Sequence, residues 1–240
     1  MTDMMLGQGA GADPAIPPKR AWLGVVSLLA IAGTQWYAIA NSAPDRDMGN
    51  LQKIMYVHVP AAWTAFIAFF IVLVASAMYL WKREERYDLV AASAAEAGAV
   101  LTALTLALGS IWGRPTWGTW WTWDARLTST AILLLIYIGY LALRAATDDV
   151  ERRARWSAAV GILGAINVPI VYMSVRWWRT LHQVQSSPST VSSSYVDGLR
   201  LNALSMTLVL VWLITARYRA ACLQRAAESA AENVALGGRA

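Results

Sequence analysis

The sequence predicts an all-α, polytopic membrane protein, a bundle of six transmembrane helices with a tryptophan-rich outer loop. Of its 240 residues 57% are hydrophobic and only 15% are charged, and the mean hydropathy is +0.41. A chain of this composition would not be soluble. It contains six apolar runs, and about 20 residues at roughly 1.5 Å each are enough to cross the ~30 Å of hydrocarbon in a bilayer. Charged segments, which are too costly to bury in lipid, separate several of these runs.

We expect the spans, in order, at residues 21–40, 60–81, 89–111, 127–144, 156–175 and 199–217, which form one transmembrane domain over residues 21–217. Residues 1–20, rich in Gly, Ala and Pro, are expected to be a short, largely disordered tail. The charged runs 82–86 and 148–155 mark the breaks after the second and fourth spans. A secretory signal is the alternative for the first run, but its length and the spans that follow favour an uncleaved helix. Residues 218–240 are expected to be a tail that extends the last helix and frays.

The distribution of Lys and Arg predicts how the helices are oriented. Thirteen of the twenty basic residues fall on the side of the two termini: Lys19, Arg20, Lys82, Arg83, Arg86, Arg144, Arg152, Arg153, Arg155, Arg217, Arg219, Arg225 and Arg239. Seven fall on the other side: Arg46, Lys53, Arg114, Arg126, Arg176, Arg179 and Arg200. Basic residues concentrate in cytoplasmic loops, so both termini are predicted to be cytoplasmic. The net charge of +5 is divided between the two sides, and we expect membrane lipid but no nucleic acid among the partners.

The most unusual stretch is WGRPTWGTWWTWDARLTS, residues 112–129, in the second outer connection. Five tryptophans crowd into its first dozen positions: Trp112, Trp117, Trp120, Trp121 and Trp123. Several indole rings together form a platform on which a planar molecule can stack. Because Pro115 interrupts helices, and Gly113 and Gly118 supply turns, we expect a non-helical loop that carries an aromatic shelf.

An interfacial belt is the alternative interpretation of so much tryptophan, since this residue gathers where membrane helices meet lipid headgroups. A belt spreads its tryptophans over many helix ends and needs no Asp among them. That description suits the single tryptophans near the ends of the apolar runs, which are Trp22, Trp36, Trp63, Trp81, Trp156 and Trp212. The clustered five are therefore expected to serve a binding site.

The chain has only two histidines, and both fall in outer segments. His58 lies in VHVPAAW just before Pro60, where the chain is expected to enter the second span. His182 lies in WWRTLHQ, shortly after the fifth span. Either one alone would most simply be a hydrogen-bonded surface residue. Because both lie on the side of the tryptophan loop, in segments that flank it, we interpret them as a pair of metal ligands.

Two imidazoles suit the axial positions of an iron porphyrin, here haem b bound without covalent attachment. A structural zinc site would need four ligands. The single cysteine, Cys222, provides neither a cysteine pair nor a CxxCH attachment site. The tryptophans would face the macrocycle. The propionates favour arginine, and the candidates are Arg114, Arg126, Arg176 and Arg179, of which we expect at most half to touch the ligand.

Three polar features have more than one interpretation. Asp124 suits a helix N-cap that opens the fourth span, and it could also pair with Arg126 or Arg114, or act directly at the site. Glu96 lies inside the third span, where a carboxylate is costly, and we expect it to pack or to contact a partner rather than to transfer protons. The Ser- and Pro-rich residues 186–194 are typical of an exposed linker, with a mobile segment near His182 as the alternative.

At these residues the sequence resembles a known family. WGRPTWGTWWTWDARLTS is similar to the WWD signature of bacterial haem-handling membrane proteins, and most of the chain resembles the cytochrome c maturation protein C family, CcmC, also called haem exporter protein C. Six spans, the signature in the second outer loop, and one histidine each in VHVPAAW and WWRTLHQ carry the resemblance. Larger WWD relatives, the haem-lyase subunits and cytochrome c synthetases, have more spans and more histidines.

The resemblance implies a non-catalytic step in c-type cytochrome biogenesis at the bacterial inner membrane. In this family haem is held at the periplasmic face, with His58 and His182 at the positions of its axial ligands and the WWD loop as the platform. Haem then passes to the periplasmic chaperone CcmE. The ABC transporter subunits CcmA and CcmB use ATP to release the loaded chaperone, and the small protein CcmD is associated. The chain has no GxxxxGK[ST] loop, so nucleotide hydrolysis is expected in a partner.

Two other functions are weighed against this one. Oligosaccharyltransferases also carry a WWD-type outer signature, so a membrane enzyme acting on a lipid-linked substrate is an alternative. Glycosyl transfer of that kind needs a divalent metal and several outer carboxylates, and only Asp45, Asp47, Asp124 and Asp197 are available. A purely structural subunit would bind no chromophore and would tolerate loss of both histidines. We expect haem handling without enzymatic activity.

Overall fold

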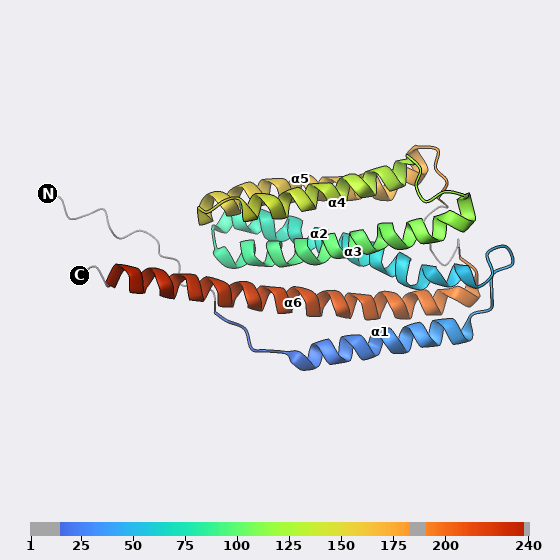
Figure 1. Ribbon diagram of the computed structural model, residues 1–240, viewed down its shortest axis with the longest axis horizontal. Helices are drawn as coiled ribbons and strands as arrows, with labels where there is room; N and C mark the ends of the chain where they lie inside the picture. Colours follow the sequence, from blue (N-terminus) through green and yellow to red (C-terminus); the bar gives the residue numbers. More distant parts are fainter. Residues whose placement is uncertain (1–14, 183–190, 238–240) are drawn as a thin grey trace.

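The protein is a bundle of six long helices (Figure 1). The computed structural model describes residues 15–182 and 191–237. Its helices are α1 (Ala21–Asn41), α2 (Met55–Lys82), α3 (Glu85–Trp117), α4 (Ala125–Ala145), α5 (Val150–Trp177) and α6 (Ser193–Gly237), with a short 3-10 helix, η1 (Asn50–Ile54), before α2. All six long helices are apolar enough to cross a membrane, which confirms the predicted fold class.

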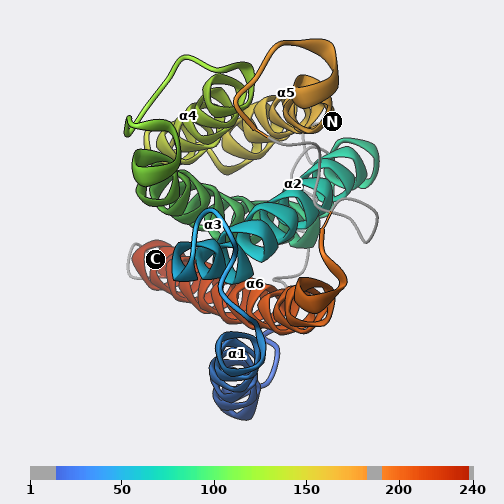
Figure 2. The ribbon, with the colours of Figure 1, turned by 90° about the vertical axis from the view of Figure 1, so that its right-hand side faces the viewer.

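The helices are arranged in layers (Figure 2). Seen along the bundle, α4 and α5 lie on one flank, α2 and α3 in the middle, and α6 beyond them, with α1 outermost against α6. The connections alternate between the two ends of the bundle. Residues 83–84 and 146–149 join helices at the end where α1 begins and α6 ends, which we call the tail end (Figure 1). Residues 42–49, 118–124 and 178–182 lie at the opposite end, the site end.

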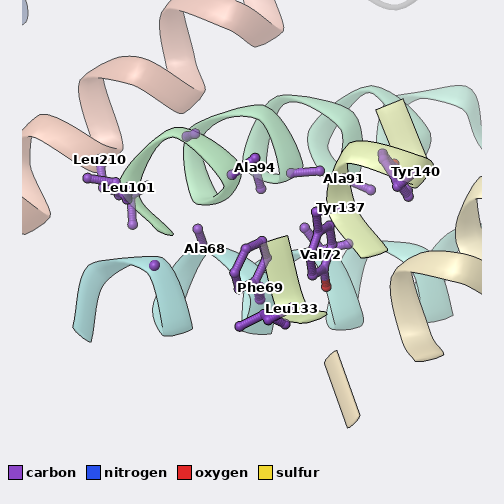
Figure 3. Close-up of a cluster of buried hydrophobic side chains, with 14 of the residues drawn as sticks. Ala68, Phe69, Val72, Ala91, Ala94, Leu101, Leu133, Tyr137, Tyr140 and Leu210 are labelled. Atoms are coloured by element: carbon purple, nitrogen blue, oxygen red, sulfur yellow. The ribbon is translucent and has the colours of Figure 1, made fainter. Parts of the chain in front are cut away.

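The centre of the bundle consists of aromatic rings packed against small residues (Figure 3). Phe69 of α2 stacks on Tyr137 of α4 with ring centroids 3.9 Å apart and an interplanar angle of 13°. Gly98 of α3 and Gly164 of α5 meet these rings so closely that an added Cβ would lie 2.6 Å from Phe69 and 3.0 Å from Tyr137, respectively. Small residues let helix backbones approach one another, which matters in lipid because no hydrophobic force draws helices together there.

A buried polar cluster fastens α1 to the rest of the bundle. Pro60 within α2 has no N–H, so the Tyr56 carbonyl four residues earlier lacks its helical partner. The Gln35 side chain of α1 donates to this carbonyl at 3.0 Å and to Asn202 Oδ1 at 2.7 Å. Asn202 is fully buried on α6 and donates back to the Thr34 carbonyl of α1 at 3.3 Å. Helix α2 therefore accommodates a proline because another helix satisfies the carbonyl that the proline frees.

Four helices begin four to six residues before their predicted spans: α2 and α5, and also α3 at Glu85 and α6 at Ser193. α2 begins at Met55, so His58 lies in its first turns and not in the loop before it. The expectation that Pro60 marks the helix entrance was wrong, since Gln35 compensates for the missing hydrogen bond. α5 begins at Val150, because the Asp149 side chain accepts the Arg152 N–H at 2.7 Å and caps the helix. The charged residues 150–155 are thus the first turns of α5 and not part of a connection.

The largest correction concerns the tryptophan stretch. α3 continues through Pro115 to Trp117 and ends at Gly118, whose φ of +77° is a conformation that glycine adopts readily. Pro115 lies in the last turn, where it removes one hydrogen bond close to the point at which the helix ends anyway. The prediction of a non-helical loop was therefore wrong for residues 112–117. The loop is confined to residues 118–124, and α4 starts at Ala125.

The remaining expectations concern Glu96, the end of the last helix, and two segments that are partly outside the described residues. Glu96 forms an ion pair with Arg217 and so joins α3 to α6, in agreement with a packing role. α6 continues beyond Arg217 to Gly237, so the expected extension of the last helix is helical. Residues 1–14 of the predicted disordered tail, and residues 186–190 of the Ser- and Pro-rich stretch, lie outside the described residues.

We predict that Asn202→Ala destabilises the protein by about 1–3 kcal/mol, because it removes one of the two acceptors of the partly buried Gln35 amide and the hydrogen bond from Asn202 to the Thr34 carbonyl. Thermal unfolding of the detergent-solubilised protein measures the effect. Asn41→Ala is the matched control, since Asn41 is exposed and donates to the Tyr37 carbonyl of its own helix. Equal unfolding temperatures for the two variants would contradict the role assigned to Asn202.

Candidate functional site

The two histidines reach one shared space at the site end. Two cavities of about 120 and 170 Å³ lie there. Their linings have five residues in common: His58, Val59, Gly109, Arg126 and His182. The first cavity continues among apolar and threonine side chains of α2, α3, α4 and α5, and Trp112 and Trp117 of α3 line the second. A space with an aromatic wall and an apolar floor therefore lies between two imidazoles and one guanidinium.

His58 is held between two helices. It projects from the first turns of α2, and its ring packs edge-on against Trp112 of α3, with centroids 5.8 Å apart and an interplanar angle of 75°. Gly109 of α3 makes room for it, because a Cβ at that position would lie 3.1 Å from His58 Cε1. His58 Nδ1 is buried and has no hydrogen-bond partner among the described residues. An imidazole nitrogen beside a cavity is a potential metal ligand.

His182 lies in the connection after α5, and its ring also packs on a tryptophan. The His182 and Trp117 centroids are 4.8 Å apart at an angle of 65°. Its Nδ1 lies 3.3 Å from Asp124 Oδ1, within ion-pair distance but without the alignment of a hydrogen bond. Each of the two histidines is thus paired with one tryptophan near the end of α3.

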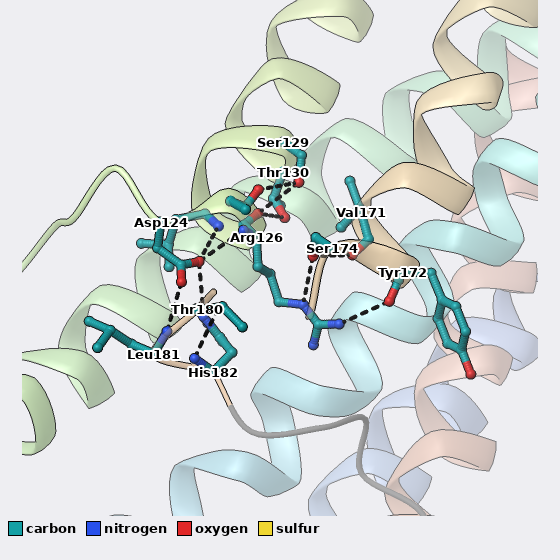
Figure 4. A network of polar contacts seen from close by, with 12 residues as sticks. Asp124, Arg126, Ser129, Thr130, Val171, Tyr172, Ser174, Thr180, Leu181 and His182 are labelled. Carbon is teal, nitrogen blue, oxygen red and sulfur yellow. Dashed lines mark hydrogen bonds and ion pairs between the residues drawn. The ribbon is translucent and has the colours of Figure 1, made fainter. Parts of the chain in front are cut away.

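Asp124 organises this part of the site (Figure 4). As predicted, it is the N-cap of α4, and its Oδ1 accepts the N–H groups of Arg126 at 2.8 Å and Leu127 at 3.2 Å. Its Oδ2 accepts the N–H of Leu181 at 2.9 Å, so the same carboxylate also fixes the segment that carries His182. Burial raises the pKa of Asp124, but the hydrogen bonds from Thr180, Leu181 and Leu127 outweigh it and the net pKa is lowered. Asp124 therefore stays ionised.

His182 is neutral at physiological pH. Burial lowers its pKa to about 4, from the ordinary value of 6.5. The Asp124 carboxylate opposes this shift and the Arg126 charge reinforces it. A neutral imidazole can bind a metal ion without first losing a proton.

Arg126 is the only one of the four predicted arginines that lines either of these cavities. It lies in the first turn of α4, and its guanidinium donates to the Tyr172 carbonyl at 3.2 Å and to Ser174 Oγ at 3.5 Å, both on α5 (Figure 4). A guanidinium has five N–H donors, so these two contacts orient the group and leave further donors for an anion.

The other predicted site residues lie outside both cavities. Trp120, Trp121 and Trp123 follow α3 in the loop and line neither cavity, and the exposed fractions of Trp120 and Trp123 are 59% and 83%. Arg114 is exposed, and its side chain donates to the Gly118 carbonyl at 2.7 Å. Arg176 and Arg179 are exposed and lie outside both linings. The expected shelf of five rings is thus two rings at the cavity and three in the loop.

Sequence reasoning missed Gly109, Val59 and Leu181. Gly109 and Gly113 are one helical turn apart on α3, and this spacing was the available signal for a face that needs room. Val59 directly follows His58 within an apolar helix and has no signal of its own. Leu181 acts through its backbone N–H, which no side-chain pattern reveals.

The donor set suits a metal that brings most of its own ligands. Among residues 15–182 and 191–237 no group of three or more His, Cys, Asp or Glu side chains could hold a bare metal ion. Two imidazoles beside aromatic rings and one arginine match an iron porphyrin, which supplies four nitrogens itself and needs axial ligands, apolar faces and a partner for its carboxylates.

Known proteins are similar to this chain over nearly its whole length. The family model described as Heme exporter protein C matches residues 15–233. Heme exporter protein C of Bradyrhizobium diazoefficiens is 41% identical over 212 residues, which is 87% of this chain and 80% of that protein. Heme exporter protein C of Escherichia coli strain K12 is 38% identical over 178 residues, 70% of this chain and 72% of its own. A Marchantia polymorpha protein, provisionally named a cytochrome c biosynthesis ccmC-like mitochondrial protein, is 42% identical over 156 residues, 65% of each chain.

We predict that His182 of the haem-free protein titrates near pH 4. The chain has two histidines, so His58→Gln leaves His182 as the sole imidazole for nitrogen-15 NMR. Because this pKa lies below that of the unfolded chain, the associated stability is complete above about pH 6.5 and is lost as the pH falls toward 4.

Asp124→Asn in the same background should lower the pKa of His182 further, since it removes the negative charge that favours the imidazolium form. Asp47→Asn, an exposed carboxylate at the same end, is the control and should leave the titration unchanged. A titration near pH 6.5 would show that the imidazole is solvated, and the site geometry would then be incorrect.

Proposed function

The chain belongs to the Heme exporter protein C family, and we propose that it binds haem b between His58 and His182 and delivers it to the chaperone CcmE during c-type cytochrome maturation. It is a multi-pass membrane protein of haem export and cytochrome c biogenesis. The family names describe transport or handling of haem and not catalysis. The observation that carries the proposal is that the two histidines of the chain, far apart in sequence, line the same two cavities.

Each residue at the cavities has a definite task in this proposal. His58 and His182 provide the two axial nitrogens, and burial keeps His182 unprotonated for this role. Trp112 and Trp117 hold the two imidazole rings by edge-on contacts and give the macrocycle an aromatic wall. Arg126 pairs with a propionate, since its guanidinium lines both cavities. Haem is cargo here, so the site must release it as well as hold it.

Delivery depends on the segments that surround the cavities. The surplus of basic residues at the tail end supports a cytoplasmic location for both termini and a periplasmic location for the site end. Trp120 and Trp123 are exposed beside the site, and they offer rings to a partner or to lipid headgroups. CcmE would approach from this side and take haem from its exposed edge. CcmA and CcmB would then release the loaded chaperone, with CcmD as a further subunit.

We predict that His58→Ala and His182→Ala each lower haem affinity more than tenfold, because loss of a residue that merely orients a ligand already costs about 10–100-fold in metal affinity. Visible absorption of detergent-purified protein, titrated with haem, measures the affinity. Wild-type protein loaded in this way should pass haem to the soluble domain of CcmE, and either variant should fail to do so.

Two arginine variants serve as a matched pair in the same titration. Arg126→Gln should weaken haem binding, because Arg126 lines both cavities, whereas Arg114→Gln should not, because Arg114 is exposed and bonded to Gly118. Circular dichroism of each variant shows whether the helices are intact. Undiminished haem affinity in both histidine variants would overturn the proposal.

A further inference from the structure

A third cavity lies at the tail end, far from the histidines. It has a volume of about 470 Å³, larger than either cavity at the site end. It lies between the segment before α1, the first turns of α3, and α6 from Trp212 to Leu223. Its walls are Pro17, Pro18, Lys19, Arg20, Ala21, Val90, Trp212, Ile214, Thr215, Ala216, Tyr218, Arg219, Ala220 and Leu223. Nothing in the haem-handling role described above uses this space.

The charged side chains in the cavity lining are all basic. Three basic side chains, Lys19, Arg20 and Arg219, line it, and its lining includes no carboxylate. Arg219 donates to the Pro17 carbonyl and so holds the segment before α1 against α6. α1 begins beside these residues, and it has no acidic residue in its first turn and no side-chain cap, so its helix dipole adds further positive charge.

Neighbouring arginines on α6 differ from those at the cavity. Arg217 pairs with Glu96, and Arg225 pairs with Glu85, so α3 already neutralises both. Lys19, Arg20 and Arg219 have no carboxylate partner among the described residues. Three unneutralised cations around one cavity favour an anionic occupant.

Apart from Thr215 and Tyr218, the remaining lining is apolar, and the cavity lies toward the end of the bundle where α1 and α3 begin. Val90, Ile214 and Leu223 face the cavity together with the Trp212 ring. Trp22, one residue into α1, is 63% exposed beside it, as expected of a tryptophan at the headgroup level. An occupant must therefore combine an anionic head with a hydrocarbon body.

We propose that this cavity binds one anionic phospholipid, with its phosphate at Lys19, Arg20 and Arg219 and its acyl chains along Val90, Trp212 and Ile214. Basic pockets between transmembrane helices at the cytoplasmic side recognise lipid headgroups in this manner. A free phosphate would leave the apolar walls unused, and a zwitterionic lipid would leave the cations uncompensated. The lipid bridges three parts of the chain: the segment before α1, helix α3 and helix α6. It therefore supports α1, the helix that packs least against the others.

Native mass spectrometry of the full-length protein in detergent, titrated with dioleoyl phosphatidylglycerol or dioleoyl phosphatidylcholine, tests the proposal. The variant Lys19→Gln/Arg20→Gln/Arg219→Gln removes the three cations of the cavity. The control variant Lys82→Gln/Arg152→Gln/Arg155→Gln removes the same charge from the tail end outside the cavity lining. We expect wild-type and control to bind one phosphatidylglycerol with an affinity at least about tenfold above that of the cavity variant.

Phosphatidylcholine should bind wild-type no better than it binds the cavity variant, and millimolar inorganic phosphate should not displace phosphatidylglycerol. Because Arg219 also holds Pro17, the double variant Lys19→Gln/Arg20→Gln, which changes two exposed side chains only, is measured as well and should show part of the loss. Equal phosphatidylglycerol affinity in the cavity and control variants would reduce the effect to general surface attraction. Displacement by phosphate would indicate a small-anion site. Either result would overturn the proposal.

Discussion

The Asp124 carboxylate is the contact on which the geometry of the site depends. One of its oxygens caps α4 through the N–H groups of Arg126 and Leu127, and the other accepts the N–H of Leu181. The carboxylate thus ties the start of the helix that carries Arg126 to the segment that carries His182. Without it, the N–H groups of Arg126 and Leu127 at the start of α4 would lose their cap, and the His182 segment would lose its anchor.

The opposite wall of the site depends on packing and not on charge. His58 reaches the cavity because α2 starts early and tolerates Pro60, and this in turn requires Gln35 of α1 to satisfy the Tyr56 carbonyl. Gly109 gives the His58 ring its space on α3. Helix α1, the outermost helix, therefore contributes to the site without touching it, through the hydrogen bond from Gln35 to the Tyr56 carbonyl in the first turn of α2.

Local patterns in the sequence predicted much of this arrangement. The apolar runs predicted six helices, and the position of Asp124 before an apolar run predicted the N-cap of α4. The order of the six spans predicted that both histidines lie at the same end of the bundle. Three-dimensional contacts decided the rest. Pro115 lies in a last helical turn where it costs little, so the tryptophans separated into two groups. Four arginines looked equivalent in the sequence, and the structure distinguishes Arg126 because it contacts α5 and lines both cavities.

The central claim is that His58 and His182 bind the same haem iron, and electron paramagnetic resonance of the oxidised, haem-loaded protein tests it most directly. Protein labelled with nitrogen-15 histidine is loaded with haem, frozen, and examined for coupling between iron and the labelled nitrogens. The account predicts a low-spin ferric signal with coupling to two imidazoles. A high-spin signal would contradict it. So would coupling to only one imidazole in the wild type, if that coupling is kept in one of the two single-histidine variants and lost in the other.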